Sequence, residues 1–338
     1  MPEWKETTSS EHNRIIYERE IRDFLPDAIL DFHVHVFNRE TLPDGFPGVP
    51  VPGGMVQGYT TEELLKDMEL VYPGKRCSAV VFGMPEKDFD HLSNNRYVAE
   101  QCDGKRLFPF RLLRPEEQPE AVLQDVLAQR YYGLKPYLNY VTGKPAREIE
   151  ILDMVPPALM AIVDRTRRIL MLHIPRDDRL ADPVNQSQIL RLADRFPSSK
   201  IVLAHVGRAY YMKAIVGHLG EIQKRDNIYV DISAITNWEI LEYLFSHFDH
   251  KRILFGTDTP LGLFGMISVA WNDQYTYITS KPWPLSISDD HGKLQFTCFA
   301  YEMIRAAKKA VRRLALKDSF LEGLYRENGL RLLESVGL

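Results

Sequence analysis

Residues 28–37 read AILDFHVHVF, a short apolar run that carries two histidines at alternate positions. Alternate side chains of a β-strand point to the same face, so His33 and His35 are expected to project together. Seven further apolar runs follow along the chain and are expected to be strands. They cover residues 77–84, 106–113, 132–137, 168–175, 200–207, 227–234 and 252–260.

The arrangement of these runs predicts the fold class. Several are continuously apolar rather than alternating, which is typical of parallel strands covered on both faces. Helical patterns lie between them, for example over residues 60–72, 115–130 and 185–196. Eight such units in succession predict an α/β protein with a (β/α)₈ TIM barrel. An open doubly wound sheet is the competitor, but no GxGxxG motif follows the first strand, which disfavours its dinucleotide-binding form.

The chain of 338 residues is expected to form a single barrel domain. An N-terminal extension would cover about residues 1–27, and C-terminal helices about residues 315–338. Two connections are longer than a plain barrel requires. Residues 38–59, rich in Gly and Pro, are expected to form an irregular loop after strand 1, and residues 259–290 to form a long loop after strand 8. Long ordered loops of this kind tend to lie at the active-site end of a barrel.

Composition excludes several classes of function. The chain is 45% hydrophobic and 26% charged, as in an ordinary globular protein, and its formal net charge of −4 argues against a nucleic-acid or membrane partner. No apolar run approaches the roughly 18 residues of a membrane span, and the polar first residues do not resemble a secretory signal. Three widely spaced cysteines form neither a disulfide framework nor a CxxC motif. These features favour a cytoplasmic location.

Metal-compatible side chains stand at the ends of other expected strands. His173 closes the run ILMLHIP, His205 closes IVLAHVG, and Asp258 follows ILFGT. Barrel enzymes place their chemistry at these carboxyl ends. Imidazole and carboxylate groups are ligands that suit a divalent metal such as zinc. Together with His33 and His35, the three residues favour a metal site over unrelated structural histidines.

The chain also resembles a known family. The stretches DFHVHVF, GLKPY, LMLHIP, IVLAHVGR, NIYVDIS and RILFGTDTP occur in the order and spacing of the amidohydrolase superfamily, specifically its amidohydrolase-2 branch, which is related to aminocarboxymuconate-semialdehyde decarboxylase. The resemblance extends from about residue 28 to the C-terminal ENGLRLL. It implies a barrel with one divalent metal, usually zinc, with manganese as the other candidate. The implied ligands are His33, His35, His173 and Asp258.

The same resemblance implies catalytic roles. Asp258 would also take a proton from the metal-activated water, and His205 would polarise the substrate or shuttle a proton. Some relatives instead use the strand-6 histidine as a ligand in a two-metal site, bridged by a carboxylated lysine on strand 4. Lys135 lies in the fourth expected strand. A second metal therefore stays open beside a lysine that binds substrate or supports the barrel.

Cations near the expected strand ends bear on the substrate. Arg111, Lys135, Arg176 and Arg208 lie in or just beyond expected strands 3 to 6. If two of them face the barrel mouth, they favour an anionic substrate, because guanidinium binds carboxylate in a bidentate fork. The alternative is that they form ion pairs in the rim. Tyr137 is a further candidate for substrate contact.

Together these features favour a metal-dependent hydrolase of a small, carboxylate-bearing lactone, ester or amide. The branch also contains decarboxylases, so non-oxidative decarboxylation of an aromatic or enoic acid is the alternative. VFN follows His35 in place of the Pro-containing continuation associated with the decarboxylases, which favours hydrolysis. A catalytically silent metal- or ligand-binding barrel is a third hypothesis, disfavoured by the complete ligand set. A homodimer is expected only by analogy with other barrels.

Overall fold

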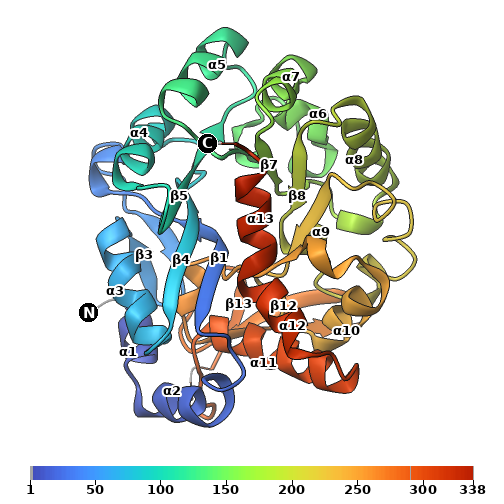
Figure 1. Cartoon of the computed structure of the whole chain (residues 1–338). Helices are drawn as coiled ribbons and strands as arrows, with labels where there is room; N and C mark the ends of the chain where they lie inside the picture. Colours follow the sequence, from blue (N-terminus) through green and yellow to red (C-terminus); the bar gives the residue numbers. More distant parts are fainter. Residues whose placement is uncertain (1–2, 290, 338) are drawn as a thin grey trace.

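Eight parallel strands form one sheet in chain order in the computed structural model, which describes residues 3–289 and 291–337 (Figure 1). Each strand pairs with the next one along the chain, as expected for successive βα units. The strands are β1 (Ala28–His35), β4 (Arg76–Phe82), β5 (Leu107–Leu113), β6 (Gly133–Pro136), β7 (Ile169–Leu172), β8 (Lys200–Leu203), β9 (Ile228–Asp231) and β10 (Ile253–Leu254).

The sheet closes because the chain that follows β10 pairs with β1. The Phe32 amide donates to the Phe255 carbonyl at 2.8 Å, and the Asp258 amide donates to the His33 carbonyl at 2.9 Å. These bonds join the first and last strands, which would otherwise be exposed edges. The predicted TIM barrel is therefore confirmed.

Helices surround the strands on the outside of the barrel (Figure 1). The first of them begins at a capping box, in which the Thr60 hydroxyl accepts from the Glu63 amide and the Glu63 carboxylate accepts from the Thr60 amide. The helices are α3 (Thr61–Val71), α4 (His91–Gln101), α5 (Pro119–Ala128), α6 (Ile151–Met154), α7 (Pro157–Arg165), α8 (Pro183–Arg195), α10 (Trp238–His247) and α11 (Phe299–Arg313). Among the described residues, no helix is long and apolar enough to cross a lipid bilayer.

The two ends of the chain pack on the barrel. The N-terminal part forms α1 (Glu3–Thr8), α2 (Glu11–Ile16) and the π-helical η1 (Tyr17–Ile21), and the C-terminal part forms α12 (Asp318–Glu322), the π-helical η9 (Gly323–Glu327) and α13 (Asn328–Glu334). Helix α13 lies across the amino-terminal end of the barrel, which faces the viewer in Figure 1. A Cβ at Gly329 would lie 2.7 Å from Leu30 Cδ2, so glycine allows this close approach to β1.

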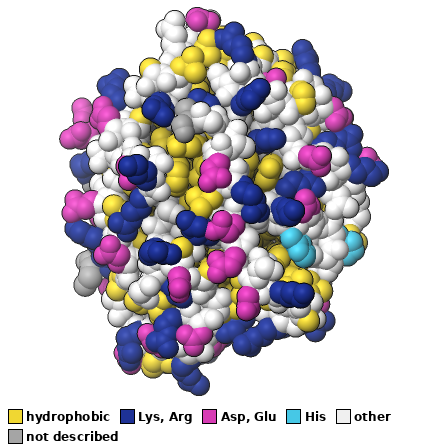
Figure 2. Space-filling view, in the orientation of Figure 1, with side chains coloured by type: hydrophobic (Ala, Val, Ile, Leu, Met, Phe, Trp, Pro, Cys, Tyr) yellow, Lys and Arg dark blue, Asp and Glu magenta, His cyan; other side chains and the backbone are white. Residues whose placement is uncertain are grey.

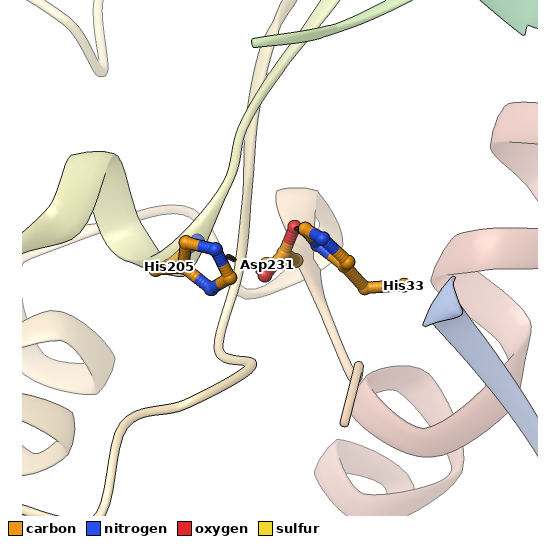
Figure 3. A group of neighbouring side chains, drawn as sticks. All are labelled: His33, His205 and Asp231. Carbon is orange, nitrogen blue, oxygen red and sulfur yellow. Dashed lines mark hydrogen bonds and ion pairs between the residues drawn. The ribbon is translucent and has the colours of Figure 1, made fainter. Parts of the chain in front are cut away.

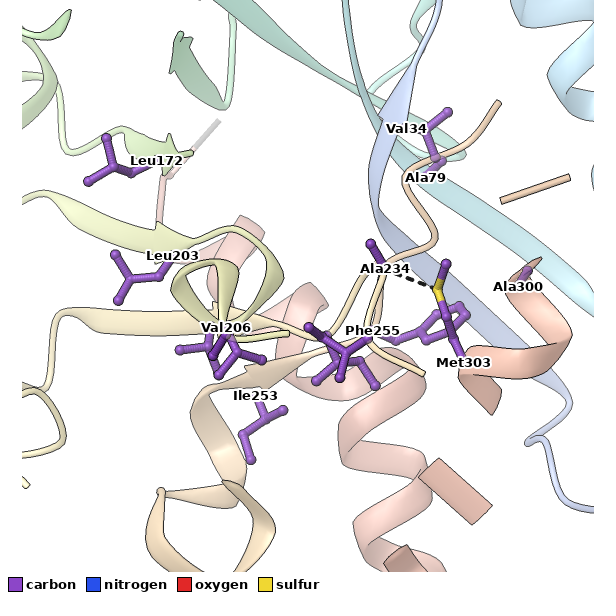
Figure 4. Packing of buried hydrophobic residues seen from close by; sticks show 14 of the residues in the cluster. Val34, Ala79, Leu172, Leu203, Val206, Ala234, Ile253, Phe255, Ala300 and Met303 are labelled. Carbon is purple, nitrogen blue, oxygen red and sulfur yellow. Dashed lines mark hydrogen bonds between the residues drawn. The ribbon is translucent and has the colours of Figure 1, made fainter. Parts of the chain in front are cut away.

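The buried core has two parts. An inner cluster fills the barrel and includes Phe32, Phe82 and Phe110 together with Leu332 and Leu333 of α13. A larger outer cluster lies between the strands and the helices, and Figure 4 shows part of it. Parallel strands buried on both faces explain why their sequences are apolar without alternation.

The two long connections carry short strands of their own. Residues 38–59, expected to be irregular, contain the hairpin β2 (Val49–Val51) and β3 (Gly54–Val56), and the connection after β10 contains β11 (Met266–Trp271), β12 (Gln274–Thr279) and β13 (Ser286–Ser288). We call these two small sheets the flap. They touch each other, because the Trp283 indole donates to the Pro50 carbonyl at 3.2 Å. Residue 290, within the second predicted loop, lies outside the described residues.

Arg111, expected to bind substrate, instead ties β5 to the connection and helix that follow it. Its guanidinium lies 2.6 Å from Glu117 Oε2 and 2.6 Å from Asp125 Oδ2, and the residue is 2% exposed. Burial would raise the pKa of Glu117, but its contact with His91 and its hydrogen bonds from Arg111 outweigh burial and lower the pKa to about 2. The structure therefore places Arg111 in an ion-pair cluster and not in the lining of the cavity described below.

Glu117→Gln should destabilise the protein at neutral pH. Lowering the pKa from 4.5 to about 2 corresponds to roughly 3 kcal/mol of folding free energy. This contribution is complete above pH 4.5 and is lost as the pH falls toward 2, because the folded-state pKa is the lower one. Urea unfolding midpoints of wild type and variant should differ most at pH 7 and converge on acidification. Glu116→Gln is the control, because the side chain of this neighbouring glutamate is 63% exposed. A difference between the two unfolding midpoints that does not change with pH would contradict this account.

Candidate metal centre

A bulge in β1 turns both histidines of the HVH motif into the barrel. The pairing of β1 with β4 shifts register between Asp31 and Val34. Phe32 belongs to the inner cluster and Val34 to the outer one, so the simple alternation is broken between them. His33 and His35 therefore share the inner face with Phe32. Bulges commonly redirect side chains beside active sites.

Three potential ligand atoms converge at the carboxyl end of the barrel. Nε2 of His33 and Nε2 of His35 lie 3.4 and 3.3 Å from Oδ1 of Asp258. Ligand atoms of a tetrahedral site with metal–ligand bonds of about 2.0–2.1 Å are separated by about 3.3–3.4 Å. The donor set therefore fits one divalent ion.

His173 stands beside this group. Its ring centroid lies 5.4 Å from that of His205 and 4.7 Å from that of Tyr137. Its Nδ1 is buried and has no hydrogen-bond partner among the described residues, although a buried polar atom without a partner is costly. His173 is outside the group whose ligand atoms all lie within 4.8 Å of one another. The structure thus places His173 next to the three convergent ligand atoms, with a ring nitrogen, Nδ1, that no described residue hydrogen-bonds.

The remaining nitrogen of each strand-1 histidine is held by a hydrogen bond. His33 Nδ1 lies 3.0 Å from Asp231 Oδ2, and His35 Nδ1 lies 2.9 Å from the Gly83 carbonyl oxygen. Because these partners accept the Nδ1 protons, Nε2 of each ring is left free to bind a metal. Asp231 is a site residue that the sequence analysis missed. The signal was available, since Asp231 ends the apolar strand IYVD just as Asp258 follows ILFGT.

Asp231 also joins His33 to His205, and these three residues form a second potential metal-binding group (Figure 3). Both carboxylate oxygens of Asp231 are already engaged, however. Oδ2 contacts His33, while Oδ1 accepts from the main-chain amides of His205 at 3.0 Å and Ser233 at 3.1 Å. Asp231 therefore supports the histidines and leaves the convergent ligand position to Asp258.

A left-handed turn positions His205 and Arg208 together. Residues 205–208 have φ angles of 55°, 53°, 64° and 59°, although only Gly207 adopts such values without strain. The other positions cost about 1–2 kcal/mol each. Strain of this kind is concentrated at functional sites. The turn lets the Arg208 guanidinium donate to the Ile174 carbonyl at 3.1 Å.

Lys135 lies deeper in the barrel, on β6. Its Nζ is 3.4 Å from His33 Nε2 and 4.8 Å from the centre of the Phe82 ring. The side chain is completely buried, and burial lowers its pKa to about 8. Lys135 is therefore adjacent to the ligand group, but it does not line the cavity above that group. Its part in a second metal site stays a prediction.

A cavity of about 450 Å³ lies above the ligand group. Its lining includes His35, His173, His205 and Asp258, so the structure joins these predicted residues to one space. Five aromatic rings form much of the wall. Tyr275, Tyr277 and Trp283 come from the flap, and the other two are Tyr137 and Tyr210. Tyr137 therefore lies where substrate contact was expected.

The predicted substrate-binding cations have different environments. Arg208 lines the cavity, has a buried Nε without a partner, and forms no ion pair with a described carboxylate. Arg176 does not line it, because its Nε donates to both Asp182 oxygens at 2.9 and 3.0 Å. With Arg111 also paired elsewhere, Arg208 is the predicted arginine that the structure brings to the cavity.

Glu86 is a second cavity residue that sequence reasoning missed. It follows β4 in the segment Met84–Pro85–Glu86, and its carboxyl has no hydrogen bond or ion pair among the described residues. Burial raises its pKa. A half-buried carboxyl without a partner, in a cavity with a strongly aromatic wall, marks a candidate functional group. No local motif signals it, because its position depends on the packing of the flap over the barrel.

The chain matches one protein-family model and is similar in fold to solved structures. Residues 30–334 match the family model described as amidohydrolase. A comparison with curated protein sequences finds no match. Solved structures are similar in fold, and one is an amidohydrolase from Burkholderia multivorans with bound HEPES (12% identity, TM-score 0.60) or bound zinc (14% identity, TM-score 0.57). In both forms 91% of this chain and 99% of the other are covered.

Two other solved structures carry more specific descriptions. A probable 2-pyrone-4,6-dicarboxylic acid hydrolase from Acinetobacter baumannii, with citric acid bound, is 14% identical with a TM-score of 0.55, covering 90% of this chain and 99% of that one. A 2,6-dihydroxybenzoate decarboxylase from Rhizobium is 16% identical with a TM-score of 0.52, covering 92% and 99%. At these identities the likeness establishes the fold alone.

Asp231→Asn should weaken metal binding without unfolding the protein. The amide keeps the shape of the side chain but removes the charge that orients His33, and such partners typically contribute about 10–100-fold to metal affinity. Zinc affinity would be measured by competition with a chromophoric chelator. Asp226→Asn, at an exposed aspartate just before β9, is the matched control. Equal zinc affinity in the two variants would contradict the assigned role of Asp231.

Proposed function

This chain belongs to the amidohydrolase family, and from that premise we propose that it is a metal-dependent hydrolase of a small, carboxylate-bearing lactone, ester or amide. The observation that carries the proposal is the convergence of His33, His35 and Asp258 beneath a cavity lined by His173 and His205. The family and its structural neighbours include hydrolases and decarboxylases. We also propose a single barrel domain over residues 1–338 in a cytoplasmic protein.

The proposed ligands are His33, His35, His173 and Asp258, holding one zinc or manganese ion. When bound, such an ion would supply an activated water and polarise the substrate carbonyl. The Asp258 carboxylate lines the cavity, so it can accept the proton of the attacking water and return it to the leaving group.

His205 is suited to moving a proton. Its Nδ1 lies 3.1 Å from the Ser233 carbonyl oxygen, which can only accept, so Nδ1 carries the proton of the neutral ring. Burial lowers the pKa of His205, which favours that neutral form. Nε2 is then an acceptor, and His205 would take up a proton before donating one to a substrate oxygen.

Arg208 would orient the substrate. Its guanidinium borders the cavity without a carboxylate partner among the described residues, and a substrate carboxylate would supply that partner. The aromatic wall suits a flat, unsaturated molecule. The same wall favours the second candidate function, non-oxidative decarboxylation of an aromatic or enoic acid. Release of CO₂ from a carboxylic-acid panel would distinguish this reaction from hydrolysis.

Elemental analysis should find about one divalent ion per chain in the wild-type protein. Asp258→Ala and His173→Ala should lose most of it, because each removes one of four proposed ligands. Metal would be quantified after reconstitution with zinc or manganese, beside hydrolysis assays on lactone and ester panels. Two ions per chain would indicate that Lys135 and His205 act as ligands. Absence of metal after reconstitution would exclude the proposed mechanism.

Arg208→Met and Glu86→Gln should change the binding of a carboxylate in opposite directions. Loss of the Arg208 charge should raise the Kd for benzoate about 10–100-fold, since a charge-assisted hydrogen bond is lost. Neutralising Glu86 should lower the Kd, because a like charge in the cavity is removed. Calorimetry on metal-loaded protein measures both, with Arg147→Met at an exposed arginine as the control. An unchanged Kd in Arg208→Met would argue against an anionic substrate.

A further inference from the structure

Five cations form a stripe from the middle of α11 to its carboxyl-terminal end. They are Arg305, Lys308, Lys309, Arg312 and Arg313. Spacings of three and four residues place them on one side of the helix, while Ala306, Ala307, Ala310 and Val311 are buried. The negative end of the helix dipole favours cations in the last turn, but Arg305 and Lys308 lie before it. There Arg305 pairs with carboxylates and Lys308 donates to the Glu20 carbonyl, and Arg313 pairs with Glu242 at 2.9 Å. Like charges at these spacings destabilise a helix, so the cations of the stripe that no carboxylate neutralises are unfavourable without a bound anion.

The stripe borders a groove of about 600 Å³, which α11 forms with η1 and the start of α10. Arg19 of η1 adds a sixth cation. Two carboxylates, Glu20 and Glu302, also line the groove, so its formal charge is clearly positive on a chain whose net charge is −4. Lys and Arg side chains lie along the lower edge of the molecule in Figure 2, among acidic and hydrophobic ones, and α2 and α11 are labelled in this lower part of Figure 1.

Carboxylates neutralise only part of this charge. Arg305 contacts Glu20 and Glu302, each at 3.0 Å. Lys309 has its ammonium 4.0 Å from the centre of the Trp238 ring, and neither Lys309 nor Arg312 forms an ion pair with a described carboxylate. Both side chains are exposed to solvent, and both line the groove. The groove thus holds unpaired cations beside an aromatic ring.

We propose that this groove is a second binding site, for a small, multiply charged anion of the phosphate-ester class. Guanidinium and ammonium groups are the side chains that bind phosphate oxygens, the former in a bidentate fork. From Arg305 to Arg312 the helix rises about 10 Å, a length that suits linked phosphates better than a single one. The groove shares no lining residue with the cavity above the metal ligands, so the proposal does not depend on the reaction.

Calorimetry with inorganic pyrophosphate tests the site on the metal-loaded protein. Wild type should bind pyrophosphate more tightly than phosphate, and sodium chloride should weaken binding because ion pairs are screened. The double variant Lys309→Ala/Arg312→Ala should lose at least about tenfold in affinity. Lys224→Ala, at an exposed lysine outside the groove, should bind as wild type does. Arg208→Met separates the groove from the catalytic cavity and should also leave pyrophosphate binding unchanged.

Trp238 provides an independent readout. An anion that draws Lys309 away from the indole should change tryptophan emission, and Trp238→Phe should abolish that change. The proposal is overturned if wild type does not bind pyrophosphate at 1 mM. It is equally overturned if the groove double variant binds as wild type does, or if Arg208→Met abolishes binding, which would place the anion in the catalytic cavity.

Discussion

The pairing of β1 with the segment after β10 is the constraint on which the site depends. The Asp258 amide donates to the His33 carbonyl across this seam, joining residues more than two hundred positions apart. Asp31 reinforces the seam, since its carboxylate accepts from the amides of His33 and Thr257. The same hydrogen bonds therefore close the barrel and bring Asp258 to the two histidines.

The barrel core supports local arrangements that are unfavourable by themselves. The bulge in β1, the left-handed turn at residues 205–208 and the buried Asp231 carboxylate each carry a cost in conformation or desolvation. Hydrogen bonds offset the desolvation cost at Asp231, because its carboxylate contacts His33 Nδ1 and also accepts from the His205 amide. The site is consequently preorganised, which is what metal binding and proton transfer require.

The barrel and the flap contribute different properties. The strand ends supply the groups that can bind a metal and move protons, whereas the flap supplies Tyr275, Tyr277 and Trp283 to the cavity wall. Contacts such as the Trp283 indole to the Pro50 carbonyl hold the two parts of the flap together. Substrate choice is therefore expected to follow the inserted sheets, while the type of chemistry follows the barrel.

Local sequence determined the elements and predicted the residues that we propose as metal ligands. Apolar runs marked the eight strands, and the alternation in HVH placed two imidazoles on one face, because the side-chain period of a strand is a short-range property. Polar residues at strand ends identified His173, His205 and Asp258, since parallel strands end at the same rim of a barrel. The Gly- and Pro-rich composition of residues 38–59 indicated a long connection but concealed its hairpin.

Tertiary structure decided which polar groups meet. Arg111 and Arg208 both follow the pattern of a cation near a strand end, yet Arg111 is neutralised by Glu117 and Asp125, while Arg208 faces the cavity. The partnership of Asp231 with His33, the cavity position of Glu86 and the groove beside α11 likewise depend on elements distant in sequence. Charge pairing and burial are set by three-dimensional neighbours, so the periodicity of one segment carries no information about them.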